Sequence, residues 1–406
     1  MVSNFKKEKM EKDKDYFNQK GKNAEKILHH LAKKTFLADW CYLNPKLPNK
    51  KELCDLLVVY DEIAIIWQIK NLKLNKQGKY EQSELEKNLR QLSGARRQLF
   101  ELKTLVELEN PFRGKEEFNP KIIKEIYLIS VLFGKGEEMF SFVEEIKKYK
   151  VHVFDKDFSQ VVLNELDTIT DFVEYLREKE IFLKKNKSLL IVGGEKELLA
   201  FYLINNRSFN RFDNADYIAI EEGSWEHLQS RPEYQAKKKE DKISYLWDGI
   251  ISRAHESSSM EYELVARELA RPNRVQRRLL SKSFLDARLK AHNDITHDLC
   301  RRIVVTDDAT YCFLLQDDPE PRGRRKEDLG TICFIARGKN IKNKKVIGIA
   351  TEKKNKPTCS YDFCLMYIPE WTNELQKQSE DIQNKYKIFL NPSIYHIREE
   401  EYPIQE

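Results

Sequence analysis

The chain has 406 residues, of which 41% are hydrophobic and 34% charged, and its formal net charge is +5. This length predicts two or more domains, and the longest apolar runs are well short of the ~20 residues that a bilayer span needs. Seven scattered cysteines without a Cys-x-x-Cys pair, and a start without a secretory pattern, predict a protein of the reducing cytoplasm with no membrane partner.

The amino-terminal segment predicts an arm followed by a helix. Residues 1–20 alternate lysines with acids and lack an apolar period, which is typical of a basic flexible arm. From Asn23 onward, apolar residues recur at helical spacing, and Glu25 lies at the edge of the buried stripe. A short strand is expected next, over residues 36–42.

Two buried strands joined by a tight turn are predicted over residues 52–70. A turn centred on residues 61–62 would place Asp55 directly opposite Gln68. Because side chains alternate along a strand, Gln68 and Lys70 would project from the same face as Asp55. A carboxylate, an amide and an ammonium on an apolar face are costly to bury without partners. They indicate either an ion pair at a strand end or a functional site.

A helix with one basic face is predicted after the hairpin, because leucines recur at helical spacing from Leu85 to Leu102. Candidates for contact with nucleic-acid phosphates on that face are Lys87, Arg90, Gln91 and Arg97. The pattern continues with a strand over 123–133, a helix over 137–148 and a strand over 151–154. This order predicts the α/β class, with a mixed β-sheet flanked by helices.

A domain boundary is expected near residues 184–187, so that residues 21–185 form the first domain and residues 186–406 a C-terminal α+β domain. Helices are expected at 260–271 and 273–291, and strands at 310–316, 331–336, 346–350 and 362–368. Basic residues of the second helix and of the loop 321–326 favour a target-binding or regulatory role for this domain.

Glu25 on a first helix, Asp55 on one strand and Gln68-x-Lys70 on the next, followed by a helix, resemble the PD-(D/E)xK nuclease superfamily. The similarity covers residues 21–155 and is closest to the Mrr-like restriction endonucleases, in which glutamine often stands in place of the second acid. The resemblance implies a restriction-endonuclease-like core. It also implies a weakened metal site, because Gln68 replaces a carboxylate.

The resemblance further implies a Mg-dependent deoxyribonuclease that hydrolyses phosphodiester bonds of DNA. Mg²⁺ or Mn²⁺ would be held by Glu25, Asp55, Gln68 and the Ile69 carbonyl, and Lys70 would orient the attacking water. Glu25, Asp55, Gln68 and Lys70 are therefore the candidate catalytic residues. A role in bacterial restriction or anti-phage defence is implied, and cutting of both strands favours a homodimer on DNA.

Two other function classes stay open. A nucleic-acid-binding protein that retains the nuclease fold but has lost cleavage would explain Gln68 as decay of the site. A phosphohydrolase would use the cluster His292, Asp294, His297 and Asp298, although its spacing matches no complete metal motif.

Overall fold

The computed structural model divides the chain into two compact units, Met1–Arg231 and Pro232–Glu406. The described residues are 26, 28–72, 82–102, 105–110, 114–133, 142–185, 188–210, 217–256, 259–294, 297, 299–317, 323–353 and 359–403. The expected arm over residues 1–20 and the candidate ligand Glu25 lie outside them.

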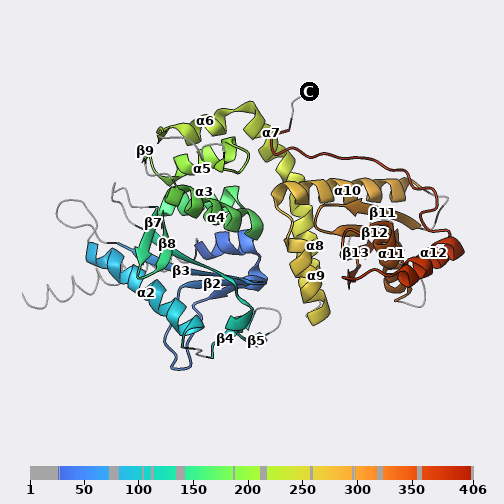
Figure 1. Ribbon diagram of the computed structural model, residues 1–406, viewed down its shortest axis with the longest axis horizontal. Coiled ribbons are helices and arrows are strands. Elements are labelled where there is room, and N and C mark those ends of the chain that lie inside the picture. Colours follow the sequence, from blue (N-terminus) through green and yellow to red (C-terminus); the bar gives the residue numbers. More distant parts are fainter. Residues whose placement is uncertain are drawn as a thin grey trace, which may run out of the picture. The chain divides into compact units, whose positions relative to one another are not determined.

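A mixed sheet organises the first unit (Figure 1). Within the described residues it has six strands in the order β1-β2-β3-β6-β8-β7. Their bounds are β1 Cys41–Leu43, β2 Leu56–Tyr60, β3 Ile63–Asn71, β6 Glu125–Phe133, β7 Val143–Ile146 and β8 Tyr149–Asp155. Strands β1, β2 and β3 are antiparallel, whereas β3, β6 and β8 are parallel. The chain therefore has the predicted α/β class with a mixed sheet.

Helices cover both faces of this sheet. The leucines of α2 (Gln82–Phe100) pack in one core with Leu57 and Ile66. Trp67, the next residue along β3, points to the opposite face, where its ring stacks on Phe172 at 5.6 Å between centroids. That face is covered by the helix over residues 28–36, by α3 (Lys156–Glu165) and by α4 (Ile169–Lys185). The central strands are thus buried on both sides, as parallel strands usually are.

Smaller elements complete the first unit. They are β4 Glu107–Asn110, β5 Gly114–Glu117, β9 Leu189–Ile191, α5 Glu195–Ile204, β10 Ile218–Ile220 and α6 Ser224–Ser230. A buried network joins α4 to α5: Lys179 pairs with Glu195, and the Tyr175 hydroxyl donates to the same carboxylate at 3.2 Å. Burial raises the pKa of Glu195 and lowers that of Lys179. Because a buried charge is costly without its partner, the Lys179–Glu195 pair keeps α5 in the first unit. The two units divide between residues 231 and 232, later in the chain than the boundary expected near residues 184–187.

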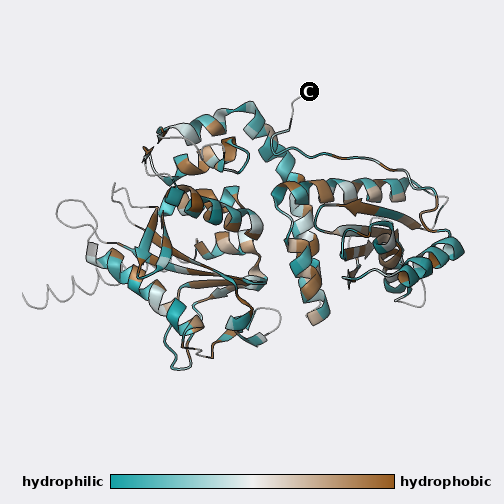
Figure 2. Cartoon of the chain, in the orientation of Figure 1, coloured by the Kyte–Doolittle hydropathy of each residue, from teal (hydrophilic) through white to brown (hydrophobic). Residues whose placement is uncertain are grey.

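The second unit contains a four-stranded sheet within the described residues, in the order β11-β12-β13-β14. Its strands are β11 Leu299–Val305, β12 Thr310–Gln316, β13 Lys345–Thr351 and β14 Tyr361–Tyr367. The helices of this unit are α7 Pro232–Glu240, α8 Tyr245–His255, α9 Met260–Ala270, α10 Arg274–Asn293, α11 Arg324–Lys339 and α12 Asn373–Tyr386. Figure 2 shows hydrophobic residues concentrated in these strands and hydrophilic ones over most of α12. Among the described residues, every helix is too short or too polar to cross a bilayer.

Three sequence-based assignments of secondary structure are wrong. Residues 331–336 belong to α11 and not to a strand, because Leu329, Ile332, Cys333 and Ala336 form a helical stripe that packs on the sheet. Residues 143–146 form β7, which pairs with β8, and not part of a helix. Residues 36–40 end a helix and form a 3-10 turn, so that only β1 is extended.

His152 gives the first unit a measurable pH dependence. The side chain is fully buried on β8, its Nε2 lies 3.1 Å from Glu180 Oε1, and burial lowers its pKa to about 4. The unfolded chain therefore binds a proton that the folded chain rejects between pH 6.5 and pH 4. Relative to His152→Gln, the wild type should lose about 3 kcal/mol of unfolding free energy between pH 7 and pH 4, measured by urea denaturation. A difference between the two proteins that does not change with pH would contradict the assignment.

Candidate functional site

The predicted strand register is present in the hairpin. Tyr60 pairs with Ile63 and Leu56 pairs with Trp67, and the Asp55 amide continues the ladder by donating to the Trp67 carbonyl at 3.2 Å. The turn is possible because Asp61 adopts a left-handed conformation with φ of 49°, which aspartate tolerates better than most residues. The pairing therefore brings Asp55 beside Gln68, as the sequence analysis expected.

Asp55 is held by donors from the neighbouring strand. The residue is 9% exposed, and Oδ2 accepts a hydrogen bond from Gln68 Nε2 at 2.7 Å and another from the Ile69 backbone N–H. Gln68 thus presents its nitrogen to Asp55 and keeps its oxygen as the acceptor end of the amide. The two bonds fix the carboxylate at the end of β3 and offset the cost of burying it.

Lys70 lies near a carboxylate that the sequence analysis missed. Its Nζ is 3.0 Å from Oε2 of Glu84, in the first turn of α2. A helix that connects two parallel strands begins beside the end of the first strand, so the parallel pairing of β3 and β6 brings Glu84 back to Lys70. This crossover is the sequence signal that could have identified Glu84.

A polar row continues from the site across the sheet. Gln68 pairs with Ser130 of β6, and Ser130 Oγ accepts a hydrogen bond from Asn88 Nδ2 at 2.7 Å. Asn88 and Glu84 are four residues apart on α2, so both face the same part of the sheet. The Asn88 side chain is fully buried, and its Oδ1 has no hydrogen-bond partner among the described residues. An unsatisfied buried oxygen at this position fits a cation or an ordered water.

The oxygen donors of the site fit magnesium better than a softer metal. Among the described residues no group of three or more His, Cys, Asp or Glu side chains could by itself hold a metal ion. Asp55, Glu84 and the Gln68 amide oxygen offer two carboxylates and one neutral oxygen. Mg²⁺ prefers oxygen ligands and keeps several waters, so such a small set is adequate.

Cys54 directly precedes Asp55, at the position where the resemblance to PD-(D/E)xK nucleases would place a proline. The side chain is 1% exposed, and burial, together with the neighbouring charge of Asp55, holds the pKa of its thiol well above the usual range. A protonated, buried thiol is neither a nucleophile nor a good metal ligand. Cys54 therefore packs in the core beside the site without taking part in its chemistry.

The basic face predicted for α2 is exposed. Its four candidate residues are Lys87, Arg90, Gln91 and Arg97, and all of them face solvent. Arg90 Nη1 lies 3.3 Å from Glu86, so part of its charge is compensated. A side chain added at Gly94 would meet no atom within 4 Å, which leaves this stretch of the helix open to a large partner.

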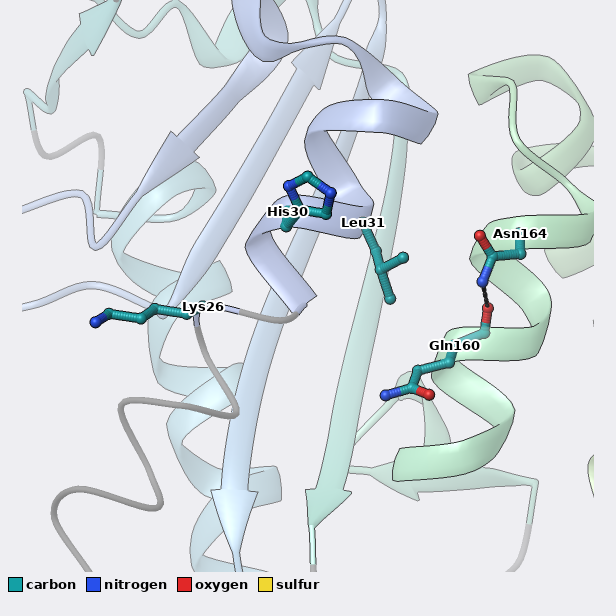
Figure 3. Close-up of a pocket in the computed structure, with 5 residues that line it drawn as sticks. All are labelled: Lys26, His30, Leu31, Gln160 and Asn164. Carbon is teal, nitrogen blue, oxygen red and sulfur yellow. Dashed lines mark hydrogen bonds between the residues drawn. The ribbon is translucent and has the colours of Figure 1, made fainter.

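A cavity of about 430 Å³ lies on the opposite side of the sheet, between the helix over residues 28–36 and α3 (Figure 3). It is lined by Lys26, His30, Leu31, Gln160 and Asn164. Asn164 Nδ2 donates to the Gln160 carbonyl at 2.8 Å. None of these residues is acidic, so the cavity does not add ligands to the polar row.

The alternative cluster in the second unit does not assemble a metal site among the described residues. His297 Nδ1 lies 2.8 Å from Asp294 Oδ2; His292 and His297 are exposed and Asp294 is half-buried. Asp298 lies outside the described residues.

Comparison with known proteins identifies no relative. No family model matches the chain, and neither the curated proteins nor the solved structures contain a significant match.

Removal of the Asp55 carboxylate should destabilise the hairpin. In Asp55→Ala two N–H groups lose their shared acceptor, so the free energy of unfolding should fall by about 2 kcal/mol in urea denaturation. Glu109→Ala, which truncates an exposed acid of β4, should change it by less than about 0.5 kcal/mol. Equal effects of the two substitutions would show that the Asp55 contacts contribute nothing.

Proposed function

We propose that the first unit is a metal-dependent DNA endonuclease of the PD-(D/E)xK type, with an active site formed by Asp55, Gln68, Lys70 and Glu84. The observation that carries this proposal is the convergence of the hairpin residues at one strand end, with Lys70 3.0 Å from Glu84. The Lys70–Glu84 pair is accompanied by the Asp55–Gln68 contact and, one helical turn after Glu84 on α2, by the unsatisfied buried Oδ1 of Asn88.

The order of elements supports the same proposal. The helix over residues 28–36 precedes three antiparallel strands, and α2 crosses to β6, which is parallel to β3. This is the succession that the resemblance implies for a restriction-endonuclease-like core. In the proposed core the active site would lie at the end of the hairpin, beside the start of α2.

The chain's own residues suit phosphodiester hydrolysis. Lys70 would orient the attacking water and stabilise the negative charge that develops on the phosphate oxygens. Asp55 and Glu84, with the Gln68 oxygen and the Ile69 carbonyl, would hold Mg²⁺ or Mn²⁺. The bound ion would lower the pKa of water and neutralise the phosphate. Glu84 supplies from α2 the second carboxylate that is missing at Gln68.

The exposed basic face of α2 supports DNA as the substrate. Phosphate contacts from Lys87 and Arg97 would hold the backbone beside the helix, and Gly94 would allow close approach. Within this proposal the enzyme would act in the bacterial cytoplasm in restriction or anti-phage defence, as a dimer when it cuts both strands.

A specific observation favours a second candidate, a nucleic-acid-binding protein without cleavage. Asp55 Oδ2 is already satisfied by two N–H donors, and Lys70 already has Glu84 as its counter-ion. A site whose groups satisfy one another can persist for stability after catalysis has been lost.

Plasmid cleavage tests the nuclease proposal. Wild-type protein should nick supercoiled DNA with Mg²⁺ or Mn²⁺ but not with EDTA, and Lys70→Ala should lower the rate by about 100-fold while DNA binding is retained. Glu84→Gln should also lower the rate, because it removes a proposed metal ligand. Lys121→Ala, an exposed lysine near the hairpin turn, is the matched control and should retain full activity. Wild-type protein that binds DNA but cuts with neither metal would support the second candidate.

Charge reversal on α2 tests the path of the DNA. Lys87→Glu should weaken binding of a short DNA duplex by about tenfold at low salt, and less as salt is raised, because a phosphate contact becomes a repulsion. Lys121→Glu makes the same change of net charge at the other end of the sheet. Fluorescence anisotropy in EDTA measures both, and equal losses would mean that α2 does not contact DNA.

A further inference from the structure

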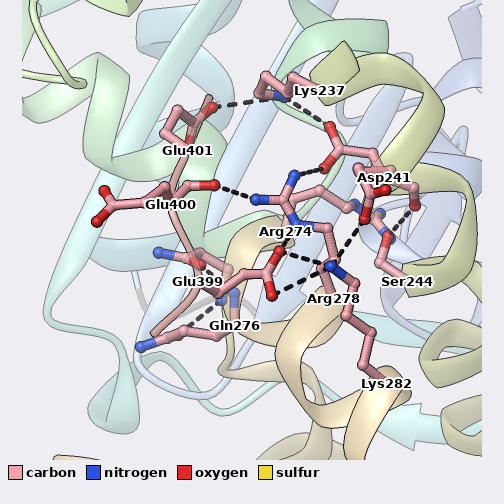
Figure 4. A network of polar contacts seen from close by, with 12 residues as sticks. Lys237, Asp241, Ser244, Arg274, Gln276, Arg278, Lys282, Glu399, Glu400 and Glu401 are labelled. Carbon is pink, nitrogen blue, oxygen red and sulfur yellow. Dashed lines mark hydrogen bonds and ion pairs between the residues drawn. The ribbon is translucent and has the colours of Figure 1, made fainter. Parts of the chain in front are cut away.

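The second unit contains a buried cluster of charges that is completed by the end of the chain (Figure 4). Arg278 and Lys282 project from α10, Lys237 lies in the last turn of α7, and Asp241 begins the 3-10 turn that follows it. Arg278 Nη1 lies 3.0 Å from Asp241 Oδ1, and Lys237 Nζ lies 2.6 Å from Asp241 Oδ2. Asp241 thus forms ion pairs with both Lys237 and Arg278, and each of these two cations also contacts the C-terminal segment.

The C-terminal tail, residues 390–403, places acids on the remaining positions of the cluster. Glu399 Oε1 lies 2.7 Å from Arg278 Nε and 2.9 Å from Lys282 Nζ, and Glu401 Oε1 lies 3.4 Å from Lys237 Nζ. Arg278 Nη2 also donates to the Glu400 carbonyl. Arg278 and Lys282 thus share one oxygen of Glu399, and an arginine and a lysine that converge on one anion form an arrangement that also suits a phosphate.

The carboxylate is an imperfect partner for Arg278. The guanidinium is fully buried, yet its Nε makes no directed hydrogen bond among the described residues, although Glu399 lies within ion-pair distance. A buried N–H without a directed acceptor is costly. An anion with more oxygens could satisfy Nε while keeping the ion pairs with Arg278 and Lys282.

Little apolar burial holds the tail in place. Between Phe389 and Glu399 the backbone forms no helix or strand, and Ile394, Tyr395 and Ile397 are 77%, 70% and 56% exposed. The attachment is therefore chiefly electrostatic at Glu399 and Glu401, and its release would forfeit few hydrophobic contacts. After release of the tail, Arg278 and Lys237 would share the single charge of Asp241, and Lys282 would keep Glu240, whose Oε2 lies 2.7 Å from its Nζ. The cluster would then carry an excess of positive charge, which favours the exchange of the tail for another anion.

We propose that Arg278, Lys282 and Lys237 form a binding site for nucleic-acid phosphates, and that Glu399 and Glu401 occupy it in the free protein as an internal substitute. The cations at 274, 278 and 282 recur every four residues, so they lie along one face of α10. A repeated row of cations suits a repeated polyanion better than a single carboxylate. The site lies in the second unit and does not require cleavage by the first.

Neutralising the tail tests the proposal. Glu399→Gln/Glu401→Gln should bind a fluorescein-labelled DNA duplex about tenfold more tightly than wild type in EDTA, because the competing charges are gone. Adding Lys282→Ala should remove this gain. Glu370→Gln/Glu374→Gln changes the net charge equally at exposed positions outside the cluster, and it should leave affinity within about twofold of wild type. Unchanged affinity of the tail variant, or an equal gain in the control, would overturn the proposal.

Two further measurements keep the test decisive. Amide hydrogen exchange in the tail of the wild-type protein should become faster when DNA is added. This measurement uses no substituted protein, so it is possible even if the tail substitutions impair folding. Unchanged or slower exchange would overturn the proposal. Polyglutamate replaces DNA in the second measurement, and an equal gain in affinity for it would overturn the assignment to phosphates. Because no assay contains divalent metal, failure here is distinguishable from failure of the nuclease proposal.

Discussion

The register of the β2–β3 hairpin is the constraint on which the rest of the first unit depends. Both faces of β3 are buried, with Ile66 in the core under α2 and Trp67 among aromatic rings on the other side. Because side chains alternate with period two, a slip of one residue in the β2–β3 pairing would turn Asp55 toward the aromatic face that Trp67 occupies. The cost of burying an unpaired carboxylate, several kcal/mol or more, opposes that slip. The same pattern that stabilises the core therefore positions the candidate site.

The two faces of the sheet carry different kinds of side chains: aromatic rings on one face, and leucines with the polar groups of the candidate site on the other. The aromatic face is packed by Phe36, Phe154 and Phe172 around Trp67, and such rings exclude water and add stability. On the other face the leucine core gives way, toward the end of β3, to amide, hydroxyl and charged groups. Packing on both faces of the sheet fixes the backbone that carries Asp55 and Lys70. Precise placement of ligands requires such a rigid backbone.

The sequence predicts this site unequally, for physical reasons. The pairing of Asp55 with Gln68 is predictable because a tight turn makes the contact local. Glu84 is not found that way, since its approach to Lys70 depends on how a crossover helix returns to the sheet. The apolar run at residues 331–336 predicts a strand because short runs fit both periods, and only its packing with β12 and β13 shows that it belongs to α11. The role of the tail depends on contacts more than a hundred residues apart, which no local pattern encodes.

The charge balance of the chain explains why both proposed sites contain carboxylates beside their cations. Seventy-one basic residues are offset by 66 acids, so the whole molecule exerts only a weak general attraction on a polyanion. Under the two proposals, affinity would then come from local groups: a bound cation would offset Asp55 and Glu84 in the first unit, and a phosphate would replace Glu399 in the second. Because one anion replaces another in such an exchange, the buried cation keeps a counter-charge. Lys70 and Arg278 are therefore held in position before any nucleic acid arrives, which reduces the cost of ordering them on binding.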